Sequence, residues 1–318
     1  MDISNHTIIL SELEDGSLND ELNIIVNDKD TYILRYLVEP FKSSKGGNSN
    51  VYLLKDKEGR KQDKVVKICN YSRPGRKTKD FIIRRYGRFI NEIKVLKDLK
   101  EKGKANIVQI DFDGVVEVKG KEFPYYVMEK ADTDLMEYLS VNKEIDEQEK
   151  IKFCLDIYNA IKQLHCEGYY HRDIKPDNIL LFYLDEDKEN AIWKLGDLGL
   201  VAHRDKDYDD IGEKIGPIGW LSPEAMNKML TEKLQMGFDC GIDDKSDIFQ
   251  LGKLFWFIFQ QNAPIGQILF DDFICQVTHK NDIFYLINEM LLYSKSKRAS
   301  KELIDIFLGE IAQKYAVA

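Results

Sequence analysis

The chain has 318 residues, of which 43% are hydrophobic and 32% are charged, and its formal net charge is −9. This composition is typical of a soluble globular protein that is long enough for one large domain or two lobes. No apolar run approaches the ~20 residues that span a bilayer, and the N-terminus lacks a basic start followed by an apolar core. We therefore expect no membrane span and a cytoplasmic protein.

Charge and cysteine usage restrict the partners further. A net negative charge disfavours long-range attraction to nucleic acid, so a nucleic-acid partner is not expected. A local basic stretch at residues 73–88 runs against this average. A solvated surface is the simplest interpretation, and two others stay open, a contact that holds the acidic segment near residue 210 and a docking site for an anionic regulator such as nucleic acid. The five cysteines are scattered without a Cys-x-x-Cys spacing, which argues against both a disulfide framework and a zinc site.

The first half of the chain predicts an antiparallel meander with one helix. Apolar runs separated by Gly/Ser/Asn-rich or charged turns indicate strands, and Ile93, Leu96 and Leu99 recur on one face of a helix. For residues 1–31, two interpretations stay open, an added strand or a partly ordered extension. In order, the predicted elements are two strands within residues 32–54, a strand at 65–68, a helix at 80–99, and strands near 107–112 and 123–128.

After residue 131 the pattern becomes helical. Short and long helices are predicted at residues 134–139 and 147–166, and the apolar run 254–259 indicates a buried helix. Two polar stretches, at residues 185–190 and 226–243, are predicted to be surface loops.

Two motifs carry the chemistry. Residues 171–178 read His-Arg-Asp-Ile-Lys-Pro-Asp-Asn, and Asp197-Leu198-Gly199 follows a short apolar strand. A γ-phosphoryl group leaving ATP spreads negative charge over several oxygens, so its transfer needs positioning and countercharge more than covalent chemistry. The two motifs supply carboxylates, an amide and a cation in a suitable order. Together they resemble the catalytic and metal-binding loops of eukaryotic-type protein kinases.

This resemblance covers about residues 32–310 and implies an α+β, two-lobed fold. It places a small antiparallel β lobe with one helix at residues 32–130 and a larger, mostly α lobe at residues 131–318, after an extension at 1–31. It also implies ATP and Mg²⁺ as cofactors and a protein substrate as the partner.

The same resemblance implies a role for each motif residue. Asp173 accepts or orients the proton of the substrate hydroxyl, and Lys175 neutralises the transferring phosphoryl group. Asn178 and Asp197 hold Mg²⁺ between phosphate oxygens. His171 packs beneath the loop as a structural residue.

A glycine-rich loop that approaches phosphates is matched only in part. The pattern reads Ser44-x-Gly46-x-x-Ser49-x-Val51 with an additional Gly47, so the middle glycine is kept while two others are serine. Alone this is a weak signal, since a hairpin turn in any β protein looks alike.

Further matches complete the nucleotide site. Lys67 is expected to reach the α and β phosphates, with Glu92 as the carboxylate that orients it. Met128, Glu129 and Ala131 match the hinge that binds adenine through backbone groups, with Met128 as gatekeeper.

Asp134 follows this hinge. Two roles are equally open for it, a contact to ribose or substrate and a helix N-cap.

Three further residues are expected to act as scaffold. Glu224, in Ser222-Pro223-Glu224, is expected to pair with Arg298. Asp247 resembles the residue that anchors the catalytic loop from beneath.

The expected type of acceptor hydroxyl follows from Lys175. A lysine two residues after the catalytic aspartate is typical of serine/threonine kinases. Pro217 stands where such kinases usually carry a threonine, and it offers neither a hydroxyl nor an N–H. We expect Ser/Thr hydroxyls of proteins as acceptors, while a small-molecule kinase and a pseudokinase or ATP-binding scaffold remain alternatives.

The segment between Asp197 and Ser222 has no Ser or Thr and is acidic. We expect Glu213, helped by Asp209 or Asp210, to pair with Arg172 and with arginines of the basic stretch in place of an activating phosphate, giving a constitutively competent kinase.

Overall fold

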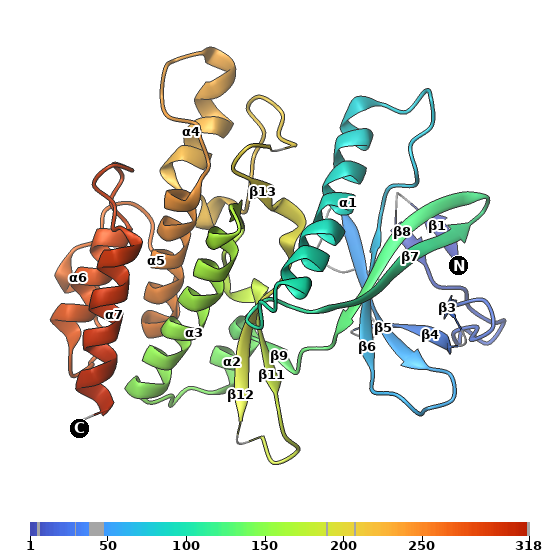
Figure 1. Cartoon of the computed structure of the whole chain (residues 1–318), viewed down its shortest axis with the longest axis horizontal. Coiled ribbons are helices and arrows are strands. Elements are labelled where there is room, and N and C mark those ends of the chain that lie inside the picture. Colours follow the sequence, from blue (N-terminus) through green and yellow to red (C-terminus); the bar gives the residue numbers. More distant parts are fainter. Residues whose placement is uncertain (5–6, 29, 38–47, 189, 207, 317–318) are drawn as a thin grey trace. The chain divides into compact units, whose positions relative to one another are not determined.

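The computed structural model describes residues 1–4, 7–28, 30–37, 48–188, 190–206 and 208–316 (Figure 1). Contacts divide them into two compact units, residues 1–103 with 108–130 and residues 104–107 with 131–318. The first unit is rich in strands and the second is mostly helical, so the predicted α+β kinase-like fold is confirmed.

The first unit is built on a six-stranded antiparallel sheet with strand order β3-β4-β5-β6-β8-β7. Alternate residues of β4 and β5 are buried, which is the pattern of a sheet with one face on a core. The strands are β3 (Ile24–Asn27), β4 (Asp30–Tyr36), β5 (Ser49–Asp56), β6 (Lys64–Cys69), β7 (Ile110–Val118) and β8 (Lys121–Glu129).

Residues 1–31 belong to this unit. They supply β3, which pairs with β4 at the edge of the sheet, and a hairpin of β1 (Asp2–Ser4) and β2 (Thr7–Ile9). Ile8 and Leu10 are buried in the same hydrophobic cluster as Tyr52 and Leu54 of β5. The N-terminal residues therefore complete the core of this unit.

Helix α1 (Asp80–Glu101) contacts β7 and β8. The predicted face is confirmed, because Ile93, Leu96 and Leu99 are all buried. One strand boundary differs from the prediction. Ile107 lies outside β7 and pairs instead with Leu195 of the second unit, and both side chains are fully buried.

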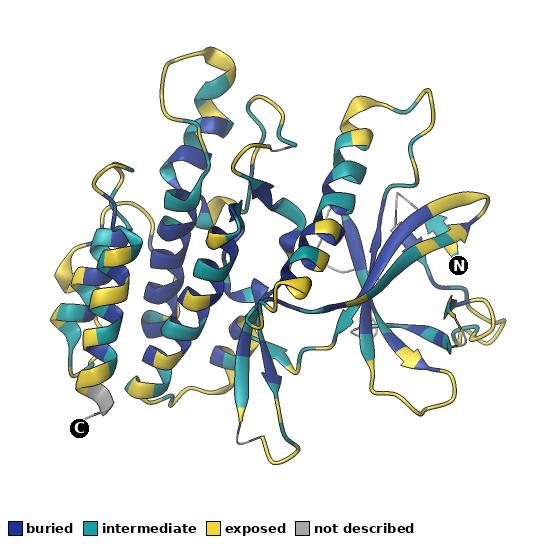
Figure 2. Cartoon of the chain, viewed as in Figure 1, coloured by how far each residue is buried: buried dark blue, intermediate teal, exposed yellow. Residues whose placement is uncertain are grey.

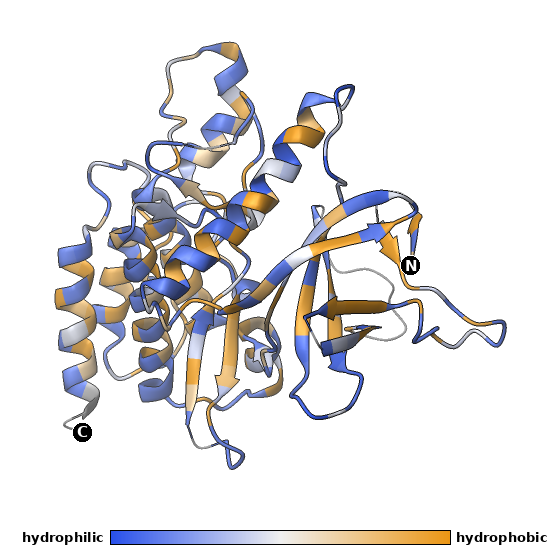
Figure 3. Cartoon of the chain, turned by 45° about the vertical axis from the view of Figure 1, so that its right-hand side comes forward, coloured by the Kyte–Doolittle hydropathy of each residue, from blue (hydrophilic) through white to orange (hydrophobic). Residues whose placement is uncertain are grey.

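The second unit is a bundle of helices with small sheets. Its helices are α2 (Leu135–Val141), α3 (Glu147–Cys166), α4 (Pro223–Thr231), α5 (Asp244–Gln260), α6 (Lys280–Met290) and α7 (Lys301–Ala316). Both hydrophobic and hydrophilic segments occur on the helices of this unit (Figure 3). A three-stranded sheet has the order β12-β11-β9, from Ala191–Leu195, Ile179–Tyr183 and Thr133–Asp134, and β10 (Tyr169–Tyr170) pairs with β13 (Ala202–His203).

Helix α5 is the centre of this unit. It is buried along most of its length, as its dark colour in Figure 2 shows, and it begins with a capping box formed by Asp243 and Ser246. Near its start, Arg298 and Glu224 form the predicted pair, with 2.8 Å between Nη2 and Oε1, and both side chains are nearly fully buried.

The two predicted surface loops have different outcomes. The described residues 185–188 and 190 lie between β11 and β12, where the Leu184 amide donates to the Asn190 carbonyl. The prediction for residues 226–243 is wrong in its first part. Helix α4, capped by the Ser222 side chain, continues through Thr231 and is followed by the 3-10 turn η4 (Glu232–Leu234), because good helix formers follow Pro223.

We expect Arg298→Met to lower the free energy of unfolding by about 3–5 kcal/mol, because Glu224 would keep a buried and unpaired charge. Urea unfolding followed by circular dichroism measures the change. The matched control is Lys301→Met, whose pair with Asp244 is about one-third exposed and should cost less than ~1 kcal/mol. Equal losses in the two variants would contradict the expectation.

Candidate functional site

The loop at residues 171–178 is fixed from beneath by one carboxylate of α5. Asp247 is fully buried and accepts the backbone amides of His171 at 2.7 Å and Arg172 at 2.8 Å. Its Oδ2 also lies 2.8 Å from Nε2 of the buried His165. The anchoring role predicted for Asp247 agrees with this geometry.

His171 ties the loop to the strand that leads to Asp197. Its Nδ1 accepts the Asp173 amide at 3.2 Å, so its Nε2 carries the proton and donates to the Gly196 carbonyl at 3.0 Å. The ring is fully buried, as expected of a structural histidine.

Arg172 has a left-handed backbone with φ of 69°. Its carbonyl accepts from Nε2 of Gln250 at 3.2 Å, and Oε1 of the same side chain accepts the Ile174 amide at 3.0 Å. This strained conformation persists because α5 holds the peptide groups on both sides.

Asp173, Lys175 and Asn178 come together in this loop. Oδ2 of Asp173 lies 3.2 Å from Nζ of Lys175 and accepts from Nδ2 of Asn178 at 3.1 Å. The buried Oδ1 has no hydrogen-bond partner among the residues that the structure describes. Burial raises the pKa of Asp173, the Lys175 cation opposes that rise, and the charge of Asp197 adds to it.

Asn178 and Asp197 are connected through the backbone. The Gly196 amide donates to the Asn178 carbonyl at 2.8 Å, which holds the residue before Asp197 against the loop. Asp197 has a left-handed φ of 51°, its Oδ1 accepts the Gly199 amide at 3.3 Å, and the neighbouring Leu198 is buried. Leucine thus fills an apolar position here.

These two residues fit a magnesium ion in their donor chemistry. Nδ2 of Asn178 already donates to Asp173, so its amide oxygen is the atom left for a ligand. A carboxylate and an amide oxygen suit Mg²⁺, which keeps several waters and phosphate oxygens in its shell. Within the described ranges, no group of three or more His, Cys, Asp or Glu side chains is placed to hold a metal.

The first unit holds a second cluster of predicted residues. Lys67 of β6 pairs with Glu92 of α1 at 2.7 Å, and both side chains are buried. The Tyr126 hydroxyl donates to the same Oε1 at 2.9 Å, which fixes the carboxylate. Val51 lies opposite Lys67 in the ladder between β5 and β6.

Of the other residues predicted to bind the nucleotide, some lie outside the described residues and others lie on strands of the first unit. Ser44, Gly46 and Gly47 lie outside the described residues, whereas Ser49 begins β5. Met128 and Glu129 end β8, and the Glu129 carboxylate accepts the Gln109 amide at 2.8 Å.

Ala131 and Asp134 belong to the second unit. Of the two roles considered for Asp134, the structure contains the helix cap. Its Oδ1 accepts the Glu137 amide at 2.8 Å at the start of α2. Burial raises the pKa of this carboxyl, and the charges of Asp177 and Glu137 add to the rise.

The expected partner of Arg172 needs a correction. Its guanidinium forms two hydrogen bonds with the Asp209 carboxylate, at 2.7 and 3.0 Å, and both side chains are almost completely buried. Glu213 instead accepts the Asp210 amide at 2.9 Å. The planar fork of arginine matches one carboxylate in two places, so Asp209 suffices as its anion.

Sequence reasoning missed three supporting residues. Gln250 and Lys253 lie on α5, where Nζ of Lys253 donates to the Gly219 carbonyl at 2.9 Å, and Tyr126 supports Glu92. A polar residue inside the otherwise apolar pattern of α5 was the signal that could have indicated the first two.

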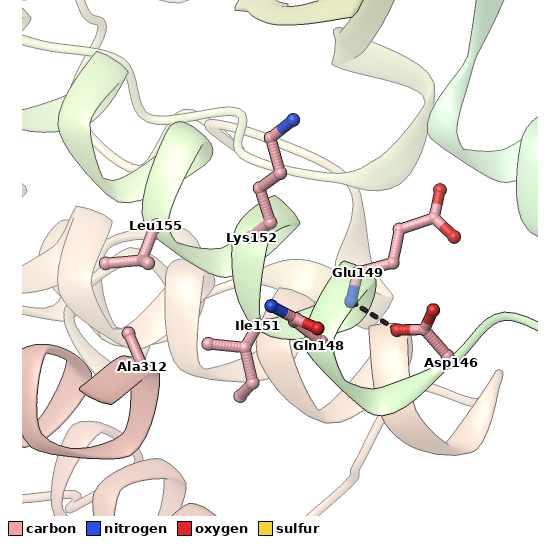
Figure 4. Close-up of a pocket in the computed structure, with 7 residues that line it drawn as sticks. All are labelled: Asp146, Gln148, Glu149, Ile151, Lys152, Leu155 and Ala312. Atoms are coloured by element: carbon pink, nitrogen blue, oxygen red, sulfur yellow. Dashed lines mark hydrogen bonds between the residues drawn. The ribbon is translucent and has the colours of Figure 1, made fainter. Parts of the chain in front are cut away.

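A cavity of about 480 Å³ in the second unit contains none of these residues. Figure 4 shows its lining by Asp146, Gln148, Glu149, Ile151, Lys152, Leu155 and Ala312, from the start of α3 and from α7. Asp146 is already used as the N-cap of α3, accepting the Glu149 amide at 2.7 Å. None of the predicted site residues lines this cavity.

Comparison with known proteins identifies the class. The family model of the protein kinase domain matches residues 44–314. The chain therefore belongs to the protein kinase domain family. Over the described residues, no helix is long and apolar enough to cross a membrane.

Curated relatives are similar at low identity. The chain is 31% identical to serine/threonine-protein kinase cds1 of Schizosaccharomyces pombe over 56% of this chain and 35% of that protein. It is 23% identical to dual specificity protein kinase TTK of Mus musculus over 70% and 24%, respectively. A calcium/calmodulin-dependent protein kinase type 1 of Caenorhabditis elegans is 32% identical over 43% and 36%. The matches thus span about a third or less of each relative.

We expect Asp173→Asn to raise the free energy of unfolding at pH 7 in protein free of Mg²⁺ and ATP. The raised pKa of Asp173 means that its ionised form is less favourable in the folded than in the unfolded protein. The contribution of this carboxyl to the free energy of unfolding is therefore fully present at low pH. It is lost as the pH rises through the pKa of the folded state. Urea unfolding at pH 7 and near pH 4 measures the gain, which should shrink toward the ordinary value of 3.8. Asp205→Asn, at an exposed carboxylate, is the control. If the stability gained by Asp173→Asn grew as the pH fell, the expected direction of the pH dependence would be wrong.

Proposed function

We propose that this protein transfers the γ-phosphoryl group of ATP to Ser or Thr hydroxyls of protein substrates. The main support for this proposal is the geometry of the buried Asp173. One of its carboxylate oxygens is held by Lys175 and Asn178, and the other has no hydrogen-bond partner among the described residues. An oriented carboxylate with a free acceptor atom suits a general base for a hydroxyl.

The reaction follows from these groups. The substrate oxygen forms a bond to the γ-phosphorus while the bond from that phosphorus to the β-phosphate oxygen breaks, releasing ADP. The hydroxyl proton passes to Oδ1 of Asp173, and the Lys175 cation offsets the charge of the phosphoryl oxygens.

Lys67 binds the α and β phosphates in this proposal. Its buried pair with Glu92, fixed in turn by Tyr126, keeps the ammonium group in one place. Asn178 and Asp197 would hold Mg²⁺, which supplies countercharge to the phosphates when bound.

Preference for Ser and Thr rests on Lys175 and on the relatives named as serine/threonine kinases. Pro217 supplies no hydroxyl, and in the same segment the Gly219 carbonyl accepts from Nζ of Lys253 on α5. One matched relative is named a dual specificity kinase, so the acceptor is part of the test.

We further propose that the kinase is active without phosphorylation of its acidic segment. The Arg172–Asp209 pair supports this, because a buried, doubly hydrogen-bonded carboxylate supplies the anion that a phosphate would otherwise provide.

We expect purified protein with radiolabelled ATP and Mg²⁺ to label a protein acceptor, and Asp173→Ala and Asp197→Ala to lower the rate by a factor of ~100 or more. Each variant removes a group that acts on the reacting phosphate. Asp205→Ala, at an exposed carboxylate of the acidic segment, should keep the wild-type rate.

The location of the label decides among the alternatives. Label on phosphoserine or phosphothreonine after acid hydrolysis supports the proposal, whereas phosphotyrosine contradicts the acceptor class. Label on a soluble acceptor indicates a small-molecule kinase. ATP binding without label in wild type and variants alike indicates a pseudokinase or scaffold.

We expect Asp209→Ala to lower kcat/KM by ~10- to 100-fold, because Arg172 would remain buried without its anion. Glu213→Ala should keep most of the activity. Phosphatase-treated wild type should be as active as untreated protein, with mass spectrometry reporting whether Tyr208 carries phosphate. Loss of activity on phosphatase treatment would contradict constitutive competence.

A further inference from the structure

The N-terminal residues make specific hydrogen bonds to the strands that carry the predicted nucleotide residues. The Tyr52 hydroxyl of β5 donates to the Ile8 carbonyl at 2.5 Å, and the Leu10 amide donates to the Tyr36 hydroxyl of β4 at 3.2 Å. Two tyrosines on adjacent strands thus hold the same short segment, one as a donor and one as an acceptor.

A second pair of bonds fixes this segment further along. The fully buried Asn23 accepts the Ser11 amide and donates to the Ser11 carbonyl, both at 2.8 Å. The Asn23 carbonyl in turn accepts the Leu34 amide of β4 at 2.8 Å. Residues 8–11 are therefore connected to β4 and β5 at three places.

The two tyrosines occupy a particular position in the sheet. Tyr36 lies opposite Tyr52 in the ladder between β4 and β5, and the residues between them include the sequence predicted to bind phosphate. Tyr52 directly follows Val51, which lies opposite Lys67 in the next ladder. A shift of β5 at Tyr52 would therefore move the neighbours of Lys67.

We propose that residues 8–11 brace the nucleotide-binding strands, and that Tyr36 and Tyr52 are positioning residues that set the affinity for ATP. The inference rests on the proposed function, because it assumes that these strands bind ATP. Preorganised strands lose less conformational freedom when a ligand binds, so the brace favours the nucleotide complex.

Apolar packing alone does not account for this arrangement. Ile8 and Leu10 are buried, but a hydrophobic contact needs no hydroxyl at residues 36 and 52. Both hydroxyls bond to backbone atoms, which are fixed along the chain, and hydrogen bonds in a buried setting define position more sharply than packing does.

The test uses full-length Tyr52→Phe and Tyr36→Phe, which remove one hydroxyl each and keep the ring. Calorimetric titration with MgATP should give a Kd raised ~3- to 10-fold for Tyr52→Phe and somewhat less for the half-buried Tyr36→Phe. KM for ATP should rise in parallel while kcat stays within ~2-fold, because Asp173 and its neighbours are untouched.

Tyr125→Phe is the matched control. Tyr125 is buried in the same hydrophobic cluster, and in the described part of the chain its hydroxyl makes no hydrogen bond. Its variant should bind MgATP as wild type does.

Melting temperatures are measured for all three variants. A lower melting temperature with unchanged Kd in both Tyr36→Phe and Tyr52→Phe would mean a purely structural role and would overturn the inference. If the wild-type protein itself binds no MgATP, the proposed function fails and the inference falls with it.

Discussion

The buried carboxylate of Asp247 is the constraint on which the second unit depends. It lies in the first turn of α5 and accepts the consecutive backbone amides of His171 and Arg172. A buried carboxylate without donors is costly, so the loop must keep these two N–H groups turned toward the helix. Successive amides can converge on one acceptor only if the chain bends sharply, which agrees with the left-handed φ of Arg172. The side chains that follow, including Asp173, then take their direction from the helix beneath them.

The same helix also controls the acidic segment. Gln250, Lys253 and Asp247 all lie on α5, and they hold the Arg172 carbonyl, the Gly219 carbonyl and the loop amides, respectively. Arg172 therefore has its backbone fixed by α5 while its side chain holds Asp209. The acidic segment and the loop at residues 171–178 therefore meet at Arg172. The polar residues of this otherwise apolar helix are the ones that make these hydrogen bonds.

The sequence predicted regular elements and the ion pairs between motif residues better than it predicted loops. Helix α3 and the buried face of α1 follow from periodicity, and the pairs Lys67–Glu92 and Glu224–Arg298 follow from motif positions. The partner of Arg172 could not be predicted from the sequence, because several acidic residues lie close together in that segment. The geometry of the turns determines which of them reaches Arg172. Gly212 and Gly216 have positive φ in that segment, and such conformations leave no periodic pattern in the sequence.

The structure of the N-terminal segment could not be predicted from the sequence for a different reason. Its strands have only three or four residues, too few for alternation to be distinguished from chance, and its bonds to Tyr36, Tyr52 and Asn23 join side chains to backbone atoms. Backbone acceptors are the same at every residue, so no sequence pattern marks them. The two units thus share one physical device. In the second unit a carboxylate accepts the backbone amides of residues 171 and 172, and in the first unit two tyrosine hydroxyls and the Asn23 side-chain amide bond to backbone atoms of residues 8–11. In each unit a polar side chain that is wholly or partly buried holds a segment through its backbone.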